Sequence, residues 1–140
     1  LSIIIETKYI LLRIKNEKDD YYLDNEGLVL PLLNHFVARV ITVTGDIEFK
    51  HHSNIFNFMK LVNKSDFWKS QITQLHFYDN EFIIIPRVGD HKIYFGELLN
   101  INSKLENLFQ FYTKVIPTKG WQKYKNVILK YENQIVCTKR

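Results

Sequence analysis

The sequence predicts an α+β domain in which two helices pack on a mostly antiparallel sheet. Three runs rich in Ile, Phe, Tyr and Val follow one another between Gln71 and Gly96. The dipeptides Asp79-Asn80 and Gly89-Asp90 separate these runs, and such residues tolerate the positive φ of tight turns between antiparallel strands. A stretch of helical periodicity on each side of this three-stranded meander supplies the two covering helices.

The strands of the meander differ in their predicted environment. The run Glu81–Val88 is nearly continuous in apolar residues, as expected for a strand covered on both faces or flanked on both sides. In the following run, Ile93 and Phe95 point to one face and their neighbours to the other. Pro86 has no N–H to donate, so we expect it at a bulge or where no partner needs a donor.

Strand patterns also open the chain. The predicted elements before the first helix are two strands, one hairpin and a further strand, over Leu1–Glu6, Tyr9–Lys15, Tyr21–Leu30 and Ala38–Val43. The hairpin turns at Asn25-Glu26-Gly27, where Gly meets the need for positive φ, and Pro31 ends it. The segment Thr44-Gly45-Asp46 closes the last of these strands.

The first helix is predicted over Ser53–Val62. Its apolar residues fall on one helical face, and Ser53 or Asn54 can cap its start. A short helical turn restarts at Ser65, again with a hydroxyl cap, and leads into the meander.

The second long helix is predicted to begin at Ser103, which can cap it, and to end at Pro117 and Gly120. The residues expected to pack this helix on the sheet are Leu105, Leu108, Phe109, Tyr112 and Ile116. Two strands over Asn126–Tyr131 and Gln134–Thr138 close the chain.

Composition limits the possible functions. With 140 residues, 14% of them aromatic, the chain is long enough for one domain with a sizeable core. Its single cysteine, Cys137, rules out an intrachain disulfide framework and a multi-cysteine metal site. The five histidines show no HxxxH or HxH spacing, so we expect surface or loop histidines and no metal. No nucleophile, phosphate-binding or dinucleotide motif is present, so the sequence predicts no enzyme and no cofactor.

Two binding modes remain open from the residues alone. The net charge of +4 and aromatic residues beside lysines, as in Phe67-Trp68-Lys69, allow stacking on single-stranded nucleic acid. The same aromatic residues equally suit core anchors, which is the interpretation favoured here. The last strand can form a sheet edge that accepts a partner strand, or it can be an inner or a charge-protected strand.

A series of short motifs along the chain resembles a known family. Each motif alone is a weak signal, but their order and spacing together are specific. The motifs are Tyr9-Ile-Leu-Leu-Arg13, Tyr21-Tyr-Leu-Asp-Asn-Glu-Gly27, Ala38-Arg-Val40, Val43-Thr-Gly45, Phe67-Trp68, Gln71-Ile72, Ile85-Pro-Arg-Val-Gly-Asp90, Gly96 and Leu129-Lys-Tyr131. In order and spacing they are similar to the extracytoplasmic β-domain of the bacterial cell-division protein FtsQ (DivIB), in the form seen in Bacteroidetes-type bacteria.

The resemblance implies a division of the chain and a setting for it. Residues 1–8 would be the end of a preceding POTRA-like domain, and residues 9–140 would be the β-domain. A membrane span upstream of this chain would anchor the protein in the bacterial inner membrane. The domain would then lie on the periplasmic, extracytoplasmic side, at the division septum.

The resemblance further implies a divisome scaffold without enzymatic activity. Its partners would be FtsB-like and FtsL-like division proteins, and no nucleic acid is expected. The FtsB-like partner would add a strand at the C-terminal edge, where Lys130-Tyr131 matches a basic residue followed by a tyrosine in the family. The partner-binding residues so implied are Lys130, Tyr131, Glu132, Ile135, Val136 and Cys137.

Overall fold

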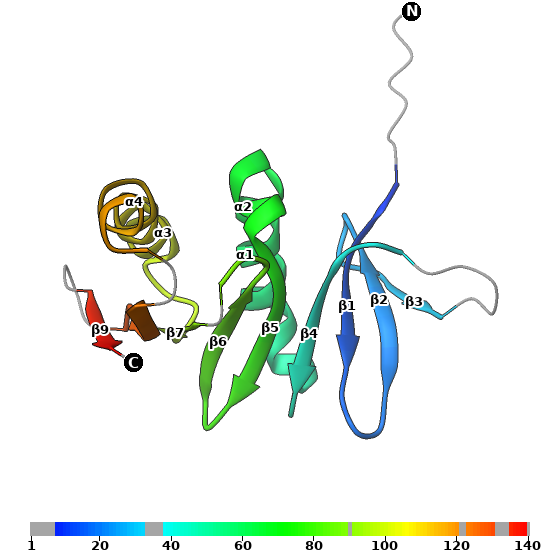
Figure 1. Cartoon of the computed structure of the whole chain (residues 1–140). Helices are drawn as coiled ribbons and strands as arrows, with labels where there is room; N and C mark the ends of the chain where they lie inside the picture. The colour runs from blue at the N-terminus through cyan, green and yellow to red at the C-terminus, as the bar shows by residue number, and fades with distance from the viewer. Residues whose placement is uncertain (1–7, 33–37, 90, 121–122, 131–134, 140) are drawn as a thin grey trace, which may run out of the picture.

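A computed structural model describes residues 8–32, 38–89, 91–120, 123–130 and 135–139. Within these residues the strands form one nine-stranded sheet in the order β3-β2-β1-β4-β5-β6-β7-β8-β9 (Figure 1). The strands are β1 (Ile10–Lys15), β2 (Asp20–Asp24), β3 (Val29–Pro31), β4 (Ile41–Gly45), β5 (Ile72–Tyr78), β6 (Glu81–Pro86), β7 (Lys92–Gly96), β8 (Tyr124–Ile128) and β9 (Val136–Lys139). Most neighbours are antiparallel, so the predicted α+β class is confirmed.

Three pairs of neighbours depart from the antiparallel pattern. Strand β4 lies parallel to both β1 and β5, and β8 lies parallel to β7. Helices connect β4 to β5 and β7 to β8, as parallel neighbours require a long crossover. The carboxyl ends of β1, β4 and β5 therefore meet at one end of the sheet.

The predicted meander is confirmed as β5, β6 and β7, which are antiparallel neighbours. Its first turn uses Asp79 and Asn80 at φ of 53° and 61°. Pro86 pairs with Ile72 next to the register shift between Ile72 and Gln74. A bulge at that position suits a residue that cannot donate to the ladder, as the sequence predicted.

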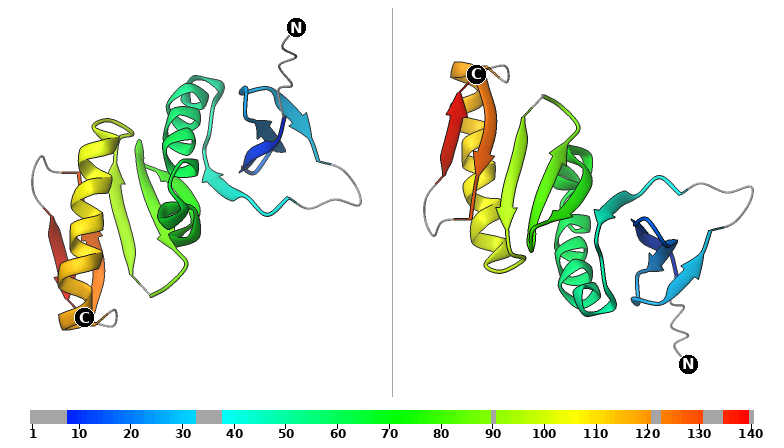
Figure 2. Two further views of the ribbon diagram at one scale, coloured as in Figure 1. Left: turned by 90° about the horizontal axis from the view of Figure 1, so that it is seen from above. Right: turned by 90° about the horizontal axis from the view of Figure 1, so that it is seen from below.

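One row of side chains crosses the sheet on its helix-covered face. Val43, Leu75, Ile84, Ile93 and Val127 lie opposite one another on neighbouring strands, and each is at most 1% exposed. The helices pack on this row, and Figure 2 shows them against a strongly twisted sheet. The core is thus a single layer between sheet and helices.

The opposite face of the sheet carries no helix in the described part of the chain. Ile83 and Ile85 of β6 are only half-buried there, whereas Phe82 and Ile84 are buried. Of the two environments predicted for β6, coverage on both faces does not hold, and the flanking by a strand on each side does. Its continuous apolar run is explained by its position between two strands, β5 and β7.

The N-terminal half follows the prediction with one shift. The hairpin of β2 and β3 is confirmed, with Gly27 at a φ of 86° in its turn. Strand β4 begins at Ile41 and not at Ala38, because its pairing with β1 begins at Leu12. The N–H of Ala38 instead donates to the Tyr22 hydroxyl at 3.2 Å. The predicted strand Leu1–Glu6 lies outside the described residues.

The first helix, α1 (His52–Asn63), buries the predicted apolar face. Its predicted caps were wrong, because a 3-10 turn, η1 (Phe49–His51), precedes it. Glu48 and His51 form a capping box around that turn, which leaves Ser53 inside the first turn of α1. In α2 (Asp66–Gln71), the predicted cap is confirmed, because the Ser65 hydroxyl accepts the Trp68 N–H at 3.2 Å.

The second long helix has three parts, α3 (Ile101–Gln110), the π-helical turn η2 (Phe111–Val115) and α4 (Ile116–Lys119). Its N-cap is Asn100 at a φ of 53°, so the predicted Ser103 cap was wrong. Pro117 lies within α4, directly after the wider π turn, and the helix ends at Gly120. Phe109 is 37% exposed and contacts the Phe67 ring at 5.2 Å between centroids.

Candidate functional site

The C-terminal strand β9 lies at one end of the sheet. It pairs antiparallel with β8, from Tyr124 opposite Lys139 to Ile128 opposite Val136. In the described part of the chain no strand pairs with its other side. That side therefore presents main-chain donors and acceptors of the kind that strand addition uses.

Side chains alternate along β9 and the residue before it. Ile135 and Cys137 are half-buried and pack against the core, whereas Val136 is 37% exposed. Of the six residues predicted to bind a partner, these three fall on or beside the edge strand. Tyr131 and Glu132 lie outside the described residues.

Lys130 is held at the end of β7 and beside the start of β6. Its ammonium lies 3.7 Å from a Glu81 carboxylate oxygen, and both side chains are more than a third exposed. Its backbone packs on Gly96, where a Cβ would lie 2.8 Å from the Lys130 Cβ. The fold thus fixes the stem of Lys130 and leaves its charge accessible to solvent.

The histidines occupy different environments. His51 accepts the Glu48 N–H at 2.9 Å, and His52 Nε2 lies 2.6 Å from the Tyr21 hydroxyl. His91 lies in the loop before β7, one of the two positions expected for the histidines, but it is only 3% exposed, with Nε2 3.0 Å from the Tyr112 hydroxyl. Burial raises the pKa of Tyr112 well above its usual value, so this hydroxyl stays protonated. No three His, Cys, Asp or Glu residues cluster as metal ligands among the described residues.

Of the aromatic residues considered for nucleic-acid stacking, Trp68 and Tyr124 belong to the core and Phe67 packs against it, while Trp121 lies outside the described residues. Trp68 is 7% exposed, and the Phe67 ring packs edge-on against it at 4.8 Å between centroids. Tyr112 lies next to Trp68 at 6.0 Å, and Tyr124 is also buried. These rings pack on one another, so their role as core anchors is confirmed for the described residues.

The family model for the FtsQ/DivIB C-terminal related family matches residues 11–138. The chain belongs to this family. No curated protein matches its sequence. The match begins in β1 and ends in β9, so it spans the whole sheet.

Membership in the FtsQ/DivIB-related family makes this a cell-division domain. The family consists of division scaffolds and not of enzymes, in agreement with the absence of a catalytic motif in the sequence. No helix in the described ranges of this chain is long and apolar enough to span a bilayer.

The lone thiol of this FtsQ/DivIB-related domain is not activated. Cys137 is free and half-buried on β9. Burial raises the pKa of its thiol, which keeps it protonated at neutral pH. Cys137 therefore packs against the core from the edge strand.

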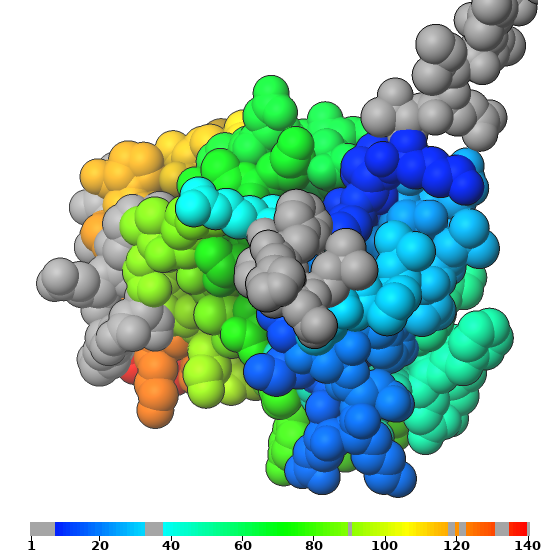
Figure 3. All heavy atoms as spheres, turned by 90° about the vertical axis from the view of Figure 1, so that its right-hand side faces the viewer, coloured from blue at the N-terminus to red at the C-terminus, as the bar shows by residue number. Residues whose placement is uncertain are grey.

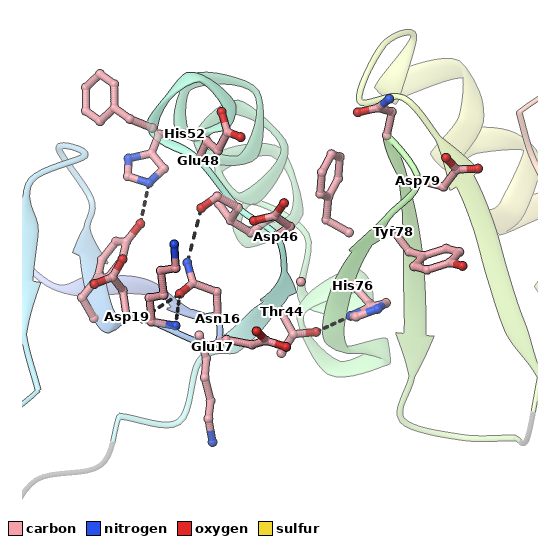
Figure 4. Close-up of a pocket in the computed structure, with 18 of the residues that line it drawn as sticks. Asn16, Glu17, Asp19, Thr44, Asp46, Glu48, His52, His76, Tyr78 and Asp79 are labelled. Carbon is pink, nitrogen blue, oxygen red and sulfur yellow. Dashed lines mark hydrogen bonds between the residues drawn. The ribbon is translucent and has the colours of Figure 1, made fainter.

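The sequence analysis missed a groove at the carboxyl ends of β1, β4 and β5. Its lining includes the β1–β2 loop, the Thr44-Gly45-Asp46 segment and the end of β5 (Figure 4). The sequence showed each as a separate loop or turn. Their proximity depends on the parallel pairing of β1, β4 and β5, which the antiparallel prediction did not contain.

Proposed function

We propose that this domain is an extracytoplasmic division scaffold that binds a partner division protein by strand addition to β9. The observation that carries the proposal is the position of β9 at the end of the sheet, with one side unpaired among the described residues. An added strand gains its affinity from main-chain hydrogen bonds, and exposed side chains on the edge select the sequence. On β9 itself the side chains of Val136, Thr138 and Lys139 are exposed, and that of Lys130, which follows β8, is more than a third exposed.

The partners proposed are an FtsB-like protein, which supplies the strand, and the FtsL-like protein that accompanies it. Family membership supports partners among division proteins in general. The residues proposed to form the site are Lys130, Tyr131, Glu132, Ile135, Val136 and Cys137. Ile135 and Cys137 contribute by holding β9 on the core, while Val136 and Lys130 face the partner.

The proposed setting is the periplasmic side of the inner membrane at the division septum. The anchor would be a membrane span upstream of this chain, followed by a POTRA-like domain that ends at about residue 8. Residues 9–140 would form the β-domain, which agrees with a family match that starts at residue 11.

A matched pair of edge variants tests the proposal. Val136→Glu places a charge on β9, and Leu30→Glu places the same charge on β3 at the opposite end of the sheet, where Leu30 is 37% exposed, as Val136 is. We expect Val136→Glu to weaken binding of an FtsB-like peptide at least tenfold, about 1.4 kcal/mol, and Leu30→Glu to leave it unchanged. Isothermal titration calorimetry measures both affinities.

Equal losses for the two variants would assign the effect to net charge and contradict the edge assignment. Unchanged binding by a folded Val136→Glu protein would contradict it directly. Far-ultraviolet circular dichroism establishes the folding of each variant. If binding weakens steeply with salt for every variant, phosphate-type electrostatics and not strand addition would explain it.

A further inference from the structure

The groove at the carboxyl ends of β1, β4 and β5 is wide and open to solvent, with a volume of about 1490 Å³. A groove of this size exceeds the usual range of small-molecule pockets and has room for a polypeptide segment. In sheets with parallel strands, ligands bind in the crevice outside the carboxyl ends. The β1–β2 hairpin that forms one side projects at the lower edge of the molecule in Figure 3.

Two aromatic side chains on its rims are unusually exposed. Phe49 of η1 is 83% exposed, and Tyr78 at the end of β5 is 69% exposed. Both residues line the groove, and Val29 adds a third exposed apolar group at 55%. Aromatic residues are enriched in protein–protein interfaces relative to the rest of the surface. Exposed apolar groups that lie close together often mark such interfaces.

The charge of the groove is opposite to that of the chain. Five carboxylates and two lysines line it, although the chain as a whole carries a net charge of +4. The carboxylates that make no hydrogen bond or ion pair with any described residue are those of Glu17, Asp19, Asp46 and Asp79. His52 adds no positive charge at neutral pH, because burial and then His51 lower its pKa.

The floor of the groove is held in place by its own hydrogen bonds. The Gln74 amide donates to the Thr44 hydroxyl at 2.8 Å, and the Thr44 hydroxyl lies 2.7 Å from His76 Nδ1 (Figure 4). Gly45 packs so closely on β5 that a Cβ would lie 2.1 Å from the Phe77 carbonyl oxygen. A fixed floor lowers the entropic cost of binding.

We infer that this groove is a docking site for an extended, basic segment of a partner polypeptide. Lysine or arginine side chains of the segment face the unpaired carboxylates, and its apolar side chains contact Phe49 and Tyr78. Nucleic acids and anionic lipid surfaces are repelled by the same carboxylates. The site is separate from β9, so a failure here leaves the strand-addition proposal unaffected.

Nuclear magnetic resonance titration of the chain with two model peptides tests this inference. The probe is a capped octapeptide of alternating arginine and leucine, and the reference peptide alternates glutamate and leucine. We expect the basic peptide to shift the amide signals of Phe49, His76 and Tyr78, and the acidic peptide to shift none of them. A basic peptide at millimolar concentration that leaves these signals unmoved would overturn the inference.

Paired variants separate the site from overall charge. Asp46→Asn with Asp79→Asn removes two groove charges, and Asn keeps the left-handed backbone that position 79 needs at a φ of 53°. Glu26→Gln with Glu106→Gln removes two charges outside the groove. We expect about a tenfold loss of affinity for the first pair only, and equal losses would reduce the effect to net charge.

A second comparison tests the aromatic rim. Phe49→Ser removes the ring from the rim, while Leu99→Ser removes a side chain that is 54% exposed elsewhere. Only Phe49→Ser should weaken peptide binding. A single-stranded oligonucleotide that displaced the peptide from the groove would contradict the proposed class of partner.

Discussion

The backbone of Gly96 lies against Lys130, and a Cβ built on Gly96 would be only 2.8 Å from the Lys130 Cβ. Gly96 also has a φ of 80°, a conformation that residues with a Cβ rarely adopt. The contact joins the end of β7 to the residue with which the proposed partner site begins. It explains why the end of β7 needs a residue without a side chain.

Gly96→Ala is therefore expected to lower the free energy of unfolding by about 1–3 kcal/mol, measured by urea denaturation. Gly120→Ala is the matched control, because Gly120 has a φ of 83° and no heavy atom of the described residues lies within 4 Å of its added Cβ. Backbone strain is common to both variants, so the additional loss in Gly96→Ala measures the contact with Lys130. Equal losses would show that the contact is unimportant.

The buried layer between the sheet and the helices predicts large effects for truncations in the meander. Phe82 is 5% exposed, and Ile84 and Phe95 are fully buried. Truncating any one of them to Ala should cost on the order of 2–5 kcal/mol, because each leaves a cavity in a closely packed layer. Leu99→Ala, at an exposed position, serves as the reference in thermal melts. If all three variants had the melting temperature of the reference, the meander would not be a main part of the core.

The buried carboxylate of Asp24 organises the β2–β3 turn. One of its oxygens accepts the N–H groups of Glu26 and Leu28, each at 2.9 Å. Asp24→Ala should lower the free energy of unfolding by about 1–3 kcal/mol, because both donors lose their acceptor. Asp24→Asn keeps an acceptor oxygen and should cost less. A greater loss for Asn than for Ala in denaturant titrations would contradict this assignment.

The contribution of Asp20 to the free energy of unfolding depends on pH. Its two oxygens accept hydrogen bonds from Arg13 at 2.7 and 2.5 Å, and this pairing lowers the Asp20 pKa from its usual 3.8. The folded state then binds fewer protons than the unfolded state, so the stabilisation is present above pH 3.8 and disappears as pH falls through the lowered pKa.

Asp20→Asn should accordingly cost about 1 kcal/mol near neutral pH, a magnitude typical of a half-exposed pair. The difference from the unmodified chain should shrink steadily below pH 3.8. Urea titrations at a series of pH values measure it. A difference that grew with acidity would have the wrong sign for this pair.

Substitution of Tyr131 tests the proposed partner site. Tyr131→Ala should weaken binding of the FtsB-like peptide strongly and leave the fold intact, since aromatic residues often dominate interfaces. If Tyr131 were a core residue, melting temperature and affinity would fall together. A stable Tyr131→Ala protein that binds as well as the unmodified chain would remove Tyr131 from the site.

Lys130→Glu should weaken the same interaction, and the defect should shrink with added salt if the partner supplies a carboxylate. The Glu81 carboxylate near Lys130 offers a matched control, because Glu81→Gln removes the internal partner without reversing the charge at position 130. Peptide binding by Glu81→Gln should be retained. A loss equal to that of Lys130→Glu would show that the pair acts through the fold.

Local signals in the sequence were sufficient for much of the fold. Hairpin turns at Gly27 and at Asp79-Asn80, the apolar face of α1 and the Ser65 cap all depend on residues close together in the chain. The helix starts at His52 and Ile101 were not predictable from nearby hydroxyls. A capping box around η1 and a left-handed Asn100 took their place.

Residue patterns were enough to predict the α+β class, the meander, the family resemblance and a candidate strand at the C-terminus. They did not predict that β4 lies parallel between β1 and β5, that β9 ends the sheet, or that His91 is buried against Tyr112, because these depend on how distant segments pack. Hydrophobic periodicity reports which face of a strand is covered, but not which strand lies beside it. The strand order decides both which edge is open and which loops share the groove, because it brings together residues far apart in the chain.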